Sequence, residues 1–282
     1  TITAEFTKQI QQLSLFAHLN EDWFEQLERI IDALKVKRNQ QMESAVHVLH
    51  NLVTQLCTYQ ESQKVLTEAQ AKSIQSILKT KFEKEIVKLE REAIQSLLST
   101  YGHQHTNLEV DNLDLPPDLF DQDQWYMWGL NKKQLVAAAS LAGAVSGAAL
   151  DAAVAGHSFM LGALGGGIIG ATSAFFGADK ITELKIKGLP LGGYVATYGP
   201  IKNRNFPYVI IGRFLYCYQQ ISQLSHANRN ALKFSSTDFQ AVVTNLEKKQ
   251  QKELHQACRD LSNQKENNKL EIVLNQLFTH IS

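Results

Sequence analysis

The feature that most constrains the fold is an apolar block in the middle of the chain. Residues 134–178 contain one charged residue, Asp151, in 45 positions. The block divides into two 21-residue pieces, 135–155 and 158–178, joined by a two-residue turn. As a helix, each piece would be about 30 Å long, which is the thickness of a bilayer core. The pattern predicts a helical hairpin that either enters a membrane or forms buried core in a helical bundle.

Small residues recur at four-residue steps in both pieces, which places them along one face of each expected helix. Such ridges let two helix backbones approach closely, as in small-xxx-small helix pairs. Asp151 lies on the first ridge, and we expect it to tie the tip of the hairpin; a proton or ion site is the alternative. The predicted packing residues are Ala139, Gly143, Gly147, Asp151 and Ala155 in the first piece, and Gly162, Gly166, Gly170, Ala174 and Ala178 in the second.

Basic residues flank the apolar block on both sides, whereas its tip carries only a histidine. Because positive residues stay on the cytoplasmic side, both ends of an inserted hairpin would be cytoplasmic. The basic stretch runs from Lys180 to Lys233, includes Arg213, and would attract anionic lipid. The predicted lipid-facing flank consists of Lys132, Lys133, Lys180, Lys185, Lys187, Lys202 and Arg204. With 28 basic and 28 acidic residues the chain has no net charge, which argues against a nucleic-acid binder.

The rest of the chain predicts a mainly α fold with four regions. Residues 1–106 form a stalk of long helices, residues 107–134 an acidic linker, residues 135–178 the glycine-zipper hairpin, and residues 179–282 a basic β-hairpin segment followed by a C-terminal helical bundle. We expect at most one small β-hairpin, near residues 185–200, where glycine and proline gather. The charges of the second long helix, Glu90 among them, are expected to form a solvated face.

No catalytic constellation is recognisable in the sequence. The segment GGGIIGATS resembles a phosphate loop, but Ala171 stands where the lysine must be. The three cysteines are widely spaced, and the histidine pairs lack the remaining ligands of a zinc site. We therefore expect a chain that is not an enzyme and that holds neither a metal nor another cofactor.

Three stretches together resemble a known family. They are the segment from Tyr101 to Leu135, the glycine-rich hairpin, and KGLPLGGYVATYGPIKNRNFPYVIIGRFLYCY at 187–218. Their order is similar to that of the domain of unknown function C-terminal to an Era-like GTPase domain in a group of bacterial GTPases. The resemblance implies a GTPase domain before this chain as its partner in cis, and that domain would hold GTP and magnesium. It also implies that the chain is a piece of a longer protein, although processing of a Met-Thr start would also leave Thr1.

Two functions remain open at this stage, with a third and weaker one. The first is a membrane-associated, non-catalytic effector or anchor domain at the cytoplasmic face of the bacterial inner membrane, bound to anionic lipid. The second is a helical interaction module in the cytoplasm, whose glycine-rich hairpin is buried core. The third is a pore-forming hairpin. Each of them allows a homo-oligomer.

Overall fold

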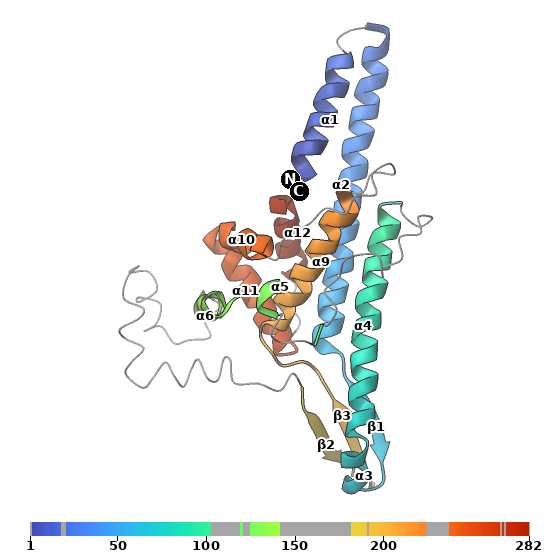
Figure 1. Ribbon diagram of the computed structural model, residues 1–282, viewed down its shortest axis with the longest axis vertical. Helices are drawn as coiled ribbons and strands as arrows, with labels where there is room; N and C mark the ends of the chain where they lie inside the picture. Colours follow the sequence, from blue (N-terminus) through green and yellow to red (C-terminus); the bar gives the residue numbers. More distant parts are fainter. Residues whose placement is uncertain are drawn as a thin grey trace, which may run out of the picture.

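The computed structural model shows a mainly helical protein with a small sheet at one end (Figure 1). It describes residues 2–17, 21–102, 119–120, 125–141, 182–190, 192–223, 237–265, 267 and 269–281. The helices in these ranges are α1 (Ile2–Ala17), α2 (Glu21–Thr58), α3 (Glu68–Ser73), α4 (Gln75–Thr100), α5 (Trp125–Trp128), α6 (Lys132–Leu141), α9 (Phe206–Gln223), α10 (Thr237–Asn245), α11 (Lys248–Ser262) and α12 (Leu270–Ile281). The strands are β1 (Glu61–Val65), β2 (Leu184–Gly188) and β3 (Tyr194–Tyr198). The mainly α class is confirmed.

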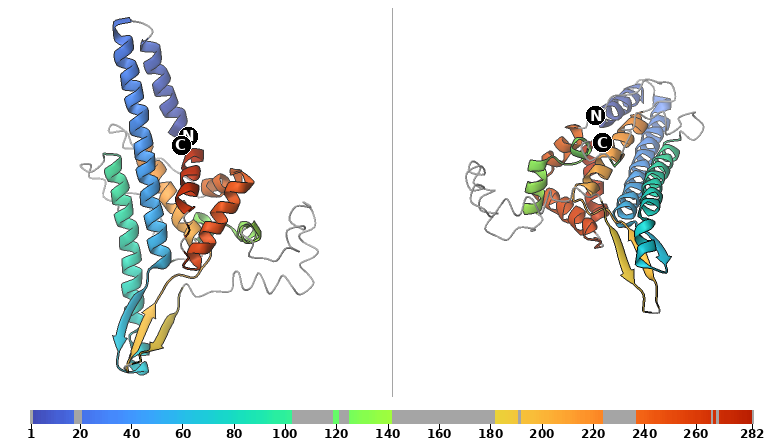
Figure 2. Two further views of the ribbon diagram at one scale, coloured as in Figure 1. Left: turned by 180° about the vertical axis from the view of Figure 1, so that it is seen from behind. Right: turned by 60° about the horizontal axis from the view of Figure 1, so that its bottom comes forward.

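The stalk is built from α2 and α4, which lie side by side over most of the length of α4 (Figures 1 and 2). No glycine or proline interrupts residues 1–101, so the apolar spacing of three and four residues can continue through a 38-residue helix. Helix α1 folds back along the first half of α2, and the two form an arm that projects beyond the rest of the molecule. Gly102, at a φ of 76°, follows the end of α4, as the sequence predicted.

The sheet has the strand order β1-β3-β2, and both pairings are antiparallel. The β2–β3 hairpin is the one expected near residues 185–200. The sequence predicts no strand at β1, because this segment lies within the region expected to form the long helices of the stalk. Thr67 and Gln70 form a capping box directly after β1, and this pattern marks a new helix start that the sequence analysis overlooked.

The centre of the molecule is α9, in which every residue from 206 to 218 is buried. It packs against α2, α4, α5 and α11, while α12 packs against α2 and α11. The C-terminal helical bundle is therefore confirmed. Within it, α10 and α11 are separate helices, and Glu247 and Gln250 form a second capping box at the start of α11.

The buried face of α4 contains a charged residue that the sequence analysis misplaced. Core residues of this helix recur at four-residue steps through Phe82, Ile86 and Ile94, and Glu90 occupies a position in the same row. Glu90 is 7% exposed, so the prediction that it belongs to a solvated face is wrong. The physical reason is a basic partner, Arg213 of α9, which the helical pattern of α4 cannot reveal.

Candidate functional site

The sheet has one covered face and one open face. Tyr198 and Ala196 are buried on the covered face, where the ring of Tyr198 packs edge-on against Phe82 of α4, with the ring centroids 5.4 Å apart. Because side chains alternate along a strand, the neighbours of these residues point to the opposite face. That open face carries Ser62, Lys64, Lys185, Lys187, Val195 and Thr197. Its three lysines are exposed, and we call this surface the basic sheet face.

The basic sheet face carries no acidic strand residue. Glu61, which is the acid of the three strands, lies on the covered face, where it accepts a hydrogen bond from the Tyr59 hydroxyl at 2.9 Å. Glu183 precedes β2 and forms an ion pair with Lys202, with 3.7 Å between Oε2 and Nζ. Lys202 therefore belongs to a local ion pair, whereas Lys64, which the sequence analysis did not single out, joins Lys185 and Lys187.

Helix α6 begins the apolar block, and it is part of the core. Leu135, Ala138 and Ala139 are 4–5% exposed, and the helix packs against α11. Its first turn is fixed by a reciprocal cap, because the amide of Asn131 donates to Gln134 Oε1 and the amide of Gln134 donates to Asn131 Oδ1, each at 3.0 Å. The residues at the start of the predicted hairpin therefore face protein on this side.

The segment before α6 is held by buried hydrogen bonds to the start of α9. Asn205 Oδ1 accepts the amide of Leu130 at 2.9 Å, and Asn205 Nδ2 donates to the carbonyl of Leu130 at 3.1 Å. A side chain at Gly212 of α9 would overlap the carbonyl oxygen of Trp128, so the close approach of the two segments requires glycine there. Two stretches that carried the family resemblance, one near residue 130 and one near residue 205, therefore meet in space.

A buried ion pair joins the stalk to the central helix. Arg213 Nε donates to Glu90 Oε1 at 2.7 Å, and Arg213 Nη2 donates to Glu90 Oε2 at 2.9 Å. The side chains are 5% and 10% exposed. Arg213 was counted in the basic stretch expected to attract lipid, and that expectation is wrong for this residue, because its guanidinium is buried against a carboxylate.

A second buried polar cluster lies between α9 and α11. The hydroxyl of Tyr208 and Nδ1 of His255 are hydrogen-bonded at 3.0 Å. Burial lowers the pKa of His255 to about 4, so its ring is neutral at neutral pH. Burial also raises the pKa of the Cys258 thiol to about 12 and that of Cys57 well above its usual range. The thiols are therefore protonated and unreactive, and the cluster is suited to packing and not to nucleophilic chemistry.

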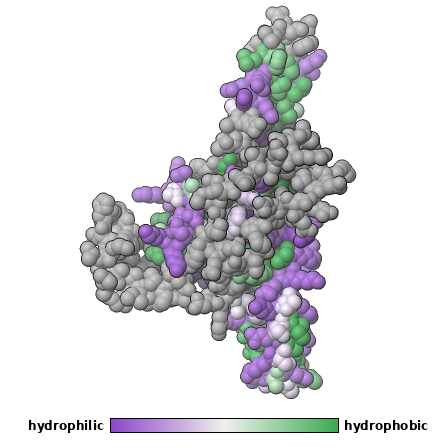
Figure 3. All heavy atoms as spheres, viewed as in Figure 1, coloured by the Kyte–Doolittle hydropathy of each residue, from purple (hydrophilic) through white to green (hydrophobic). Residues whose placement is uncertain are grey.

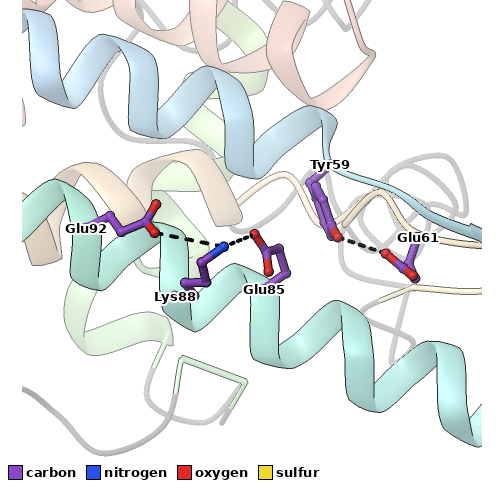
Figure 4. A network of polar contacts seen from close by, with 5 residues as sticks. All are labelled: Tyr59, Glu61, Glu85, Lys88 and Glu92. Carbon is purple, nitrogen blue, oxygen red and sulfur yellow. Dashed lines mark hydrogen bonds and ion pairs between the residues drawn. The ribbon is translucent and has the colours of Figure 1, made fainter.

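Figure 4 shows two sets of ordinary polar contacts, one along the outside of α4 and one between Tyr59 and Glu61 at the link from α2 to β1. Lys88 Nζ lies 2.8 Å from Glu85 Oε1 and 3.9 Å from Glu92 Oε1, and the hydrogen bond to Glu85 raises the pKa of Lys88. Burial, together with the hydrogen bond to Glu61, raises the pKa of Tyr59 to about 12. Exposed ion pairs of this kind contribute little to stability, and none of these groups faces a reacting partner.

The remaining residues of the predicted packing ridge and flank are placed as follows. Ala139 is buried in α6, while the ridge residues from Gly143 to Ala178, and Lys180, lie outside the described residues. Lys132 and Lys133 are exposed in the first turn of α6, and Arg204 is half-buried before α9. The ridge as a helix-packing device therefore stays a prediction.

In the described part of the chain, His, Cys, Asp and Glu residues form no cluster of three or more that could hold a metal ion. None of the helices described here has the length and apolar character needed to cross a membrane.

The comparison with known proteins gives one match. A family model described as a domain of unknown function (DUF3482) matches residues 1–277. No curated protein and no solved structure matches the chain. The matched range runs from α1 into α12 and includes the apolar block. The description names no activity, and the link to an Era-like GTPase stays a prediction.

Proposed function

The chain belongs to the family described as a domain of unknown function, DUF3482, and we propose that it is the non-catalytic effector module of a bacterial GTPase. In this proposal the module works through contacts with proteins, and a GTPase domain in the same polypeptide is its first partner. GTP and magnesium belong to that domain and not to this chain. The resemblance described for residues 101–135 and 187–218 supports the link. The expected location is the cytoplasm or the cytoplasmic face of the inner membrane.

The burial of α6 is the observation that favours an interaction module over a membrane-spanning hairpin. Residues 135–141 of the first apolar piece lie in α6, where Leu135 and Ala138 belong to the hydrophobic core. This leaves residues 142–155, or 14 of the 21 positions. A helix of that length covers about 21 Å, which is short of the roughly 30 Å of a bilayer core.

The projecting arm of α1 and α2 offers a surface for protein contacts. Exposed apolar side chains gather on it, and Figure 3 shows hydrophobic surface at this end of the molecule. Large exposed apolar groups on a well-packed domain favour an interface with another protein. Those of the arm are Leu15, Phe16, Phe24, Ile30 and Val36.

The proposal is tested by titrating the labelled chain with the Era-like GTPase domain, loaded with GDP or with a non-hydrolysable GTP analogue, and following fluorescence anisotropy. We expect binding that differs between the two nucleotides. The variant Leu15→Ser/Phe16→Ser/Ile30→Ser should bind at least tenfold more weakly, since its apolar contacts are lost. The matched control Ile77→Ser/Val87→Ser/Ile272→Ser changes three exposed apolar residues elsewhere and should bind normally. The absence of binding in both nucleotide states would contradict the proposal.

A membrane-inserted hairpin is the second candidate, and the composition of residues 142–178 favours it, because they contain a single charge. It requires α6 to leave its position against α11, so that the full 21-residue piece becomes available. Limited proteolysis of the lipid-free chain separates the two candidates. Protection of residues 142–178 without lipid supports the interaction module, and cleavage there that vesicles suppress supports insertion. Channel recordings test the weaker pore-forming alternative.

A further inference from the structure

We propose that the basic sheet face is a peripheral docking surface for the headgroups of an anionic bilayer. Its lysines come from strands far apart in the sequence, since Lys64 of β1 and Lys187 of β2 both flank Val195 of β3. The inference goes beyond the proposed function and does not depend on a GTPase partner. It also needs no membrane-spanning helix, because the surface lies on the sheet itself.

The spacing of the three ammonium groups suits a flat anionic surface. Lys64 and Lys187 are separated by two strand spacings, which is about 10 Å, and Lys185 lies about 7 Å further along β2. The side chains project from one face of a short sheet, so all three can approach a plane together. Each lysine attracts such a plane when its charge lies within about one Debye length of it, roughly 8 Å at physiological salt, and the three contributions add. The face therefore offers a concentrated positive charge within a chain that has no net charge.

A strongly exposed apolar residue follows Lys64 by two positions in the chain. Leu66 is 80% exposed, the highest value among the large apolar residues that the structure describes. It directly follows Val65, the last residue of β1. The backbone amide of Leu66 donates to Gln70 Oε1 at 3.0 Å, so the turn that presents the side chain is fixed. Lysines next to a protruding apolar group are typical of surfaces that rest on a bilayer interface.

The chemistry of this face favours lipid over nucleic acid. Tyr194 and Tyr198 are the aromatic residues of the three strands, and both lie on the covered face, so the basic sheet face has no platform on which bases could stack. The sheet also follows the apolar block closely, since β2 begins six residues after position 178.

Vesicle co-sedimentation of the full chain tests the proposal. The vesicles contain phosphatidylcholine with 30% phosphatidylglycerol, and pure phosphatidylcholine vesicles are the neutral control. The variant Lys64→Gln/Lys185→Gln/Lys187→Gln should bind the anionic vesicles about a hundredfold more weakly, as each lysine near such a surface contributes about fivefold. Leu66→Ser should weaken binding further. The matched control changes three exposed lysines of α11, Lys248, Lys249 and Lys252, to glutamine.

The wild-type chain and the α11 control are expected to bind equally, and binding should fall as salt is raised. Unchanged circular dichroism and melting temperature in both variants show that the fold is intact. Equal binding of the wild type and the sheet variant would overturn the proposal. Equal losses in the sheet and α11 variants, or equal binding to neutral vesicles, would also overturn it, because attraction would then not come from this face. Preferential binding of a single-stranded RNA by the same lysines would assign the surface to nucleic acid instead.

Discussion

Replacing Arg213 with methionine should destabilise the protein by about 3–5 kcal/mol, because it leaves the Glu90 carboxylate buried without its partner. The structure supports the upper part of this range. Both side chains are nearly inaccessible, at 5% and 10% exposure, and two hydrogen bonds of 2.7 and 2.9 Å are lost together. Each hydrogen bond to a charged group contributes about 1.5–3 kcal/mol. Because the pair is buried, water cannot easily take the place of the lost guanidinium. The loss is measured by urea unfolding, followed by far-ultraviolet circular dichroism.

Two companion variants separate the ion pair from general damage to the core. Arg213→Met/Glu90→Met replaces both charges with apolar groups, and we expect it to recover most of the stability lost by the single variant. Arg29→Met removes one partner of an exposed pair with Glu25, whose side chains are 80% and 82% exposed, and should unfold as the wild type does. The reasoning fails if Arg213→Met loses less than about 1 kcal/mol, or if the double variant is less stable than the single one.

Two further predictions concern the positions around α9. Gly212→Ala should destabilise the protein by several kcal/mol in urea unfolding, because the added methyl group would overlap the Trp128 carbonyl. The control Gly188→Ala should be tolerated, since the nearest atom to its methyl group is 3.9 Å away. Similar losses of stability in the two variants would contradict the close approach at Gly212. His255 has a folded-state pKa of about 4, below the ordinary value of 6.5, so protonation favours the unfolded chain. Stability should be full above pH 6.5 and decrease by up to about 3 kcal/mol as the pH falls to 4, as measured by urea unfolding across this range. His255→Gln should flatten that slope and His50→Gln should retain it, and an equal slope in all three proteins would refute the assignment.

The elements that the sequence predicted well are those specified by local patterns. The three- and four-residue apolar spacing predicts the long helices α2 and α4, because one face of each helix must be buried whatever it packs against. The β2–β3 hairpin followed from glycines and prolines that favour turns over helix. In each case the information lies within a few residues of the element itself.

The features that the sequence analysis missed depend on partners far away in the chain. The burial of Glu90 requires Arg213, which is 123 residues away, and no property of α4 alone indicates it. Strand β1 pairs with β3, so Lys64 becomes a neighbour of Val195 only in the folded sheet. The basic sheet face could therefore not be assembled from the sequence, although Lys185 and Lys187 were expected to contact lipid.

Hydrogen exchange of α6 tests the central claim of this account most directly, namely that the start of the apolar block is core of an interaction module. Exchange of residues 135–141 is measured by mass spectrometry, with and without vesicles of 30% phosphatidylglycerol. We predict slow exchange of these amides in the lipid-free chain and no change on adding vesicles, while residues 62–66 and 184–188 gain protection. Rapid exchange of residues 135–141 without lipid, followed by protection when vesicles are added, would contradict the account and support insertion of the hairpin.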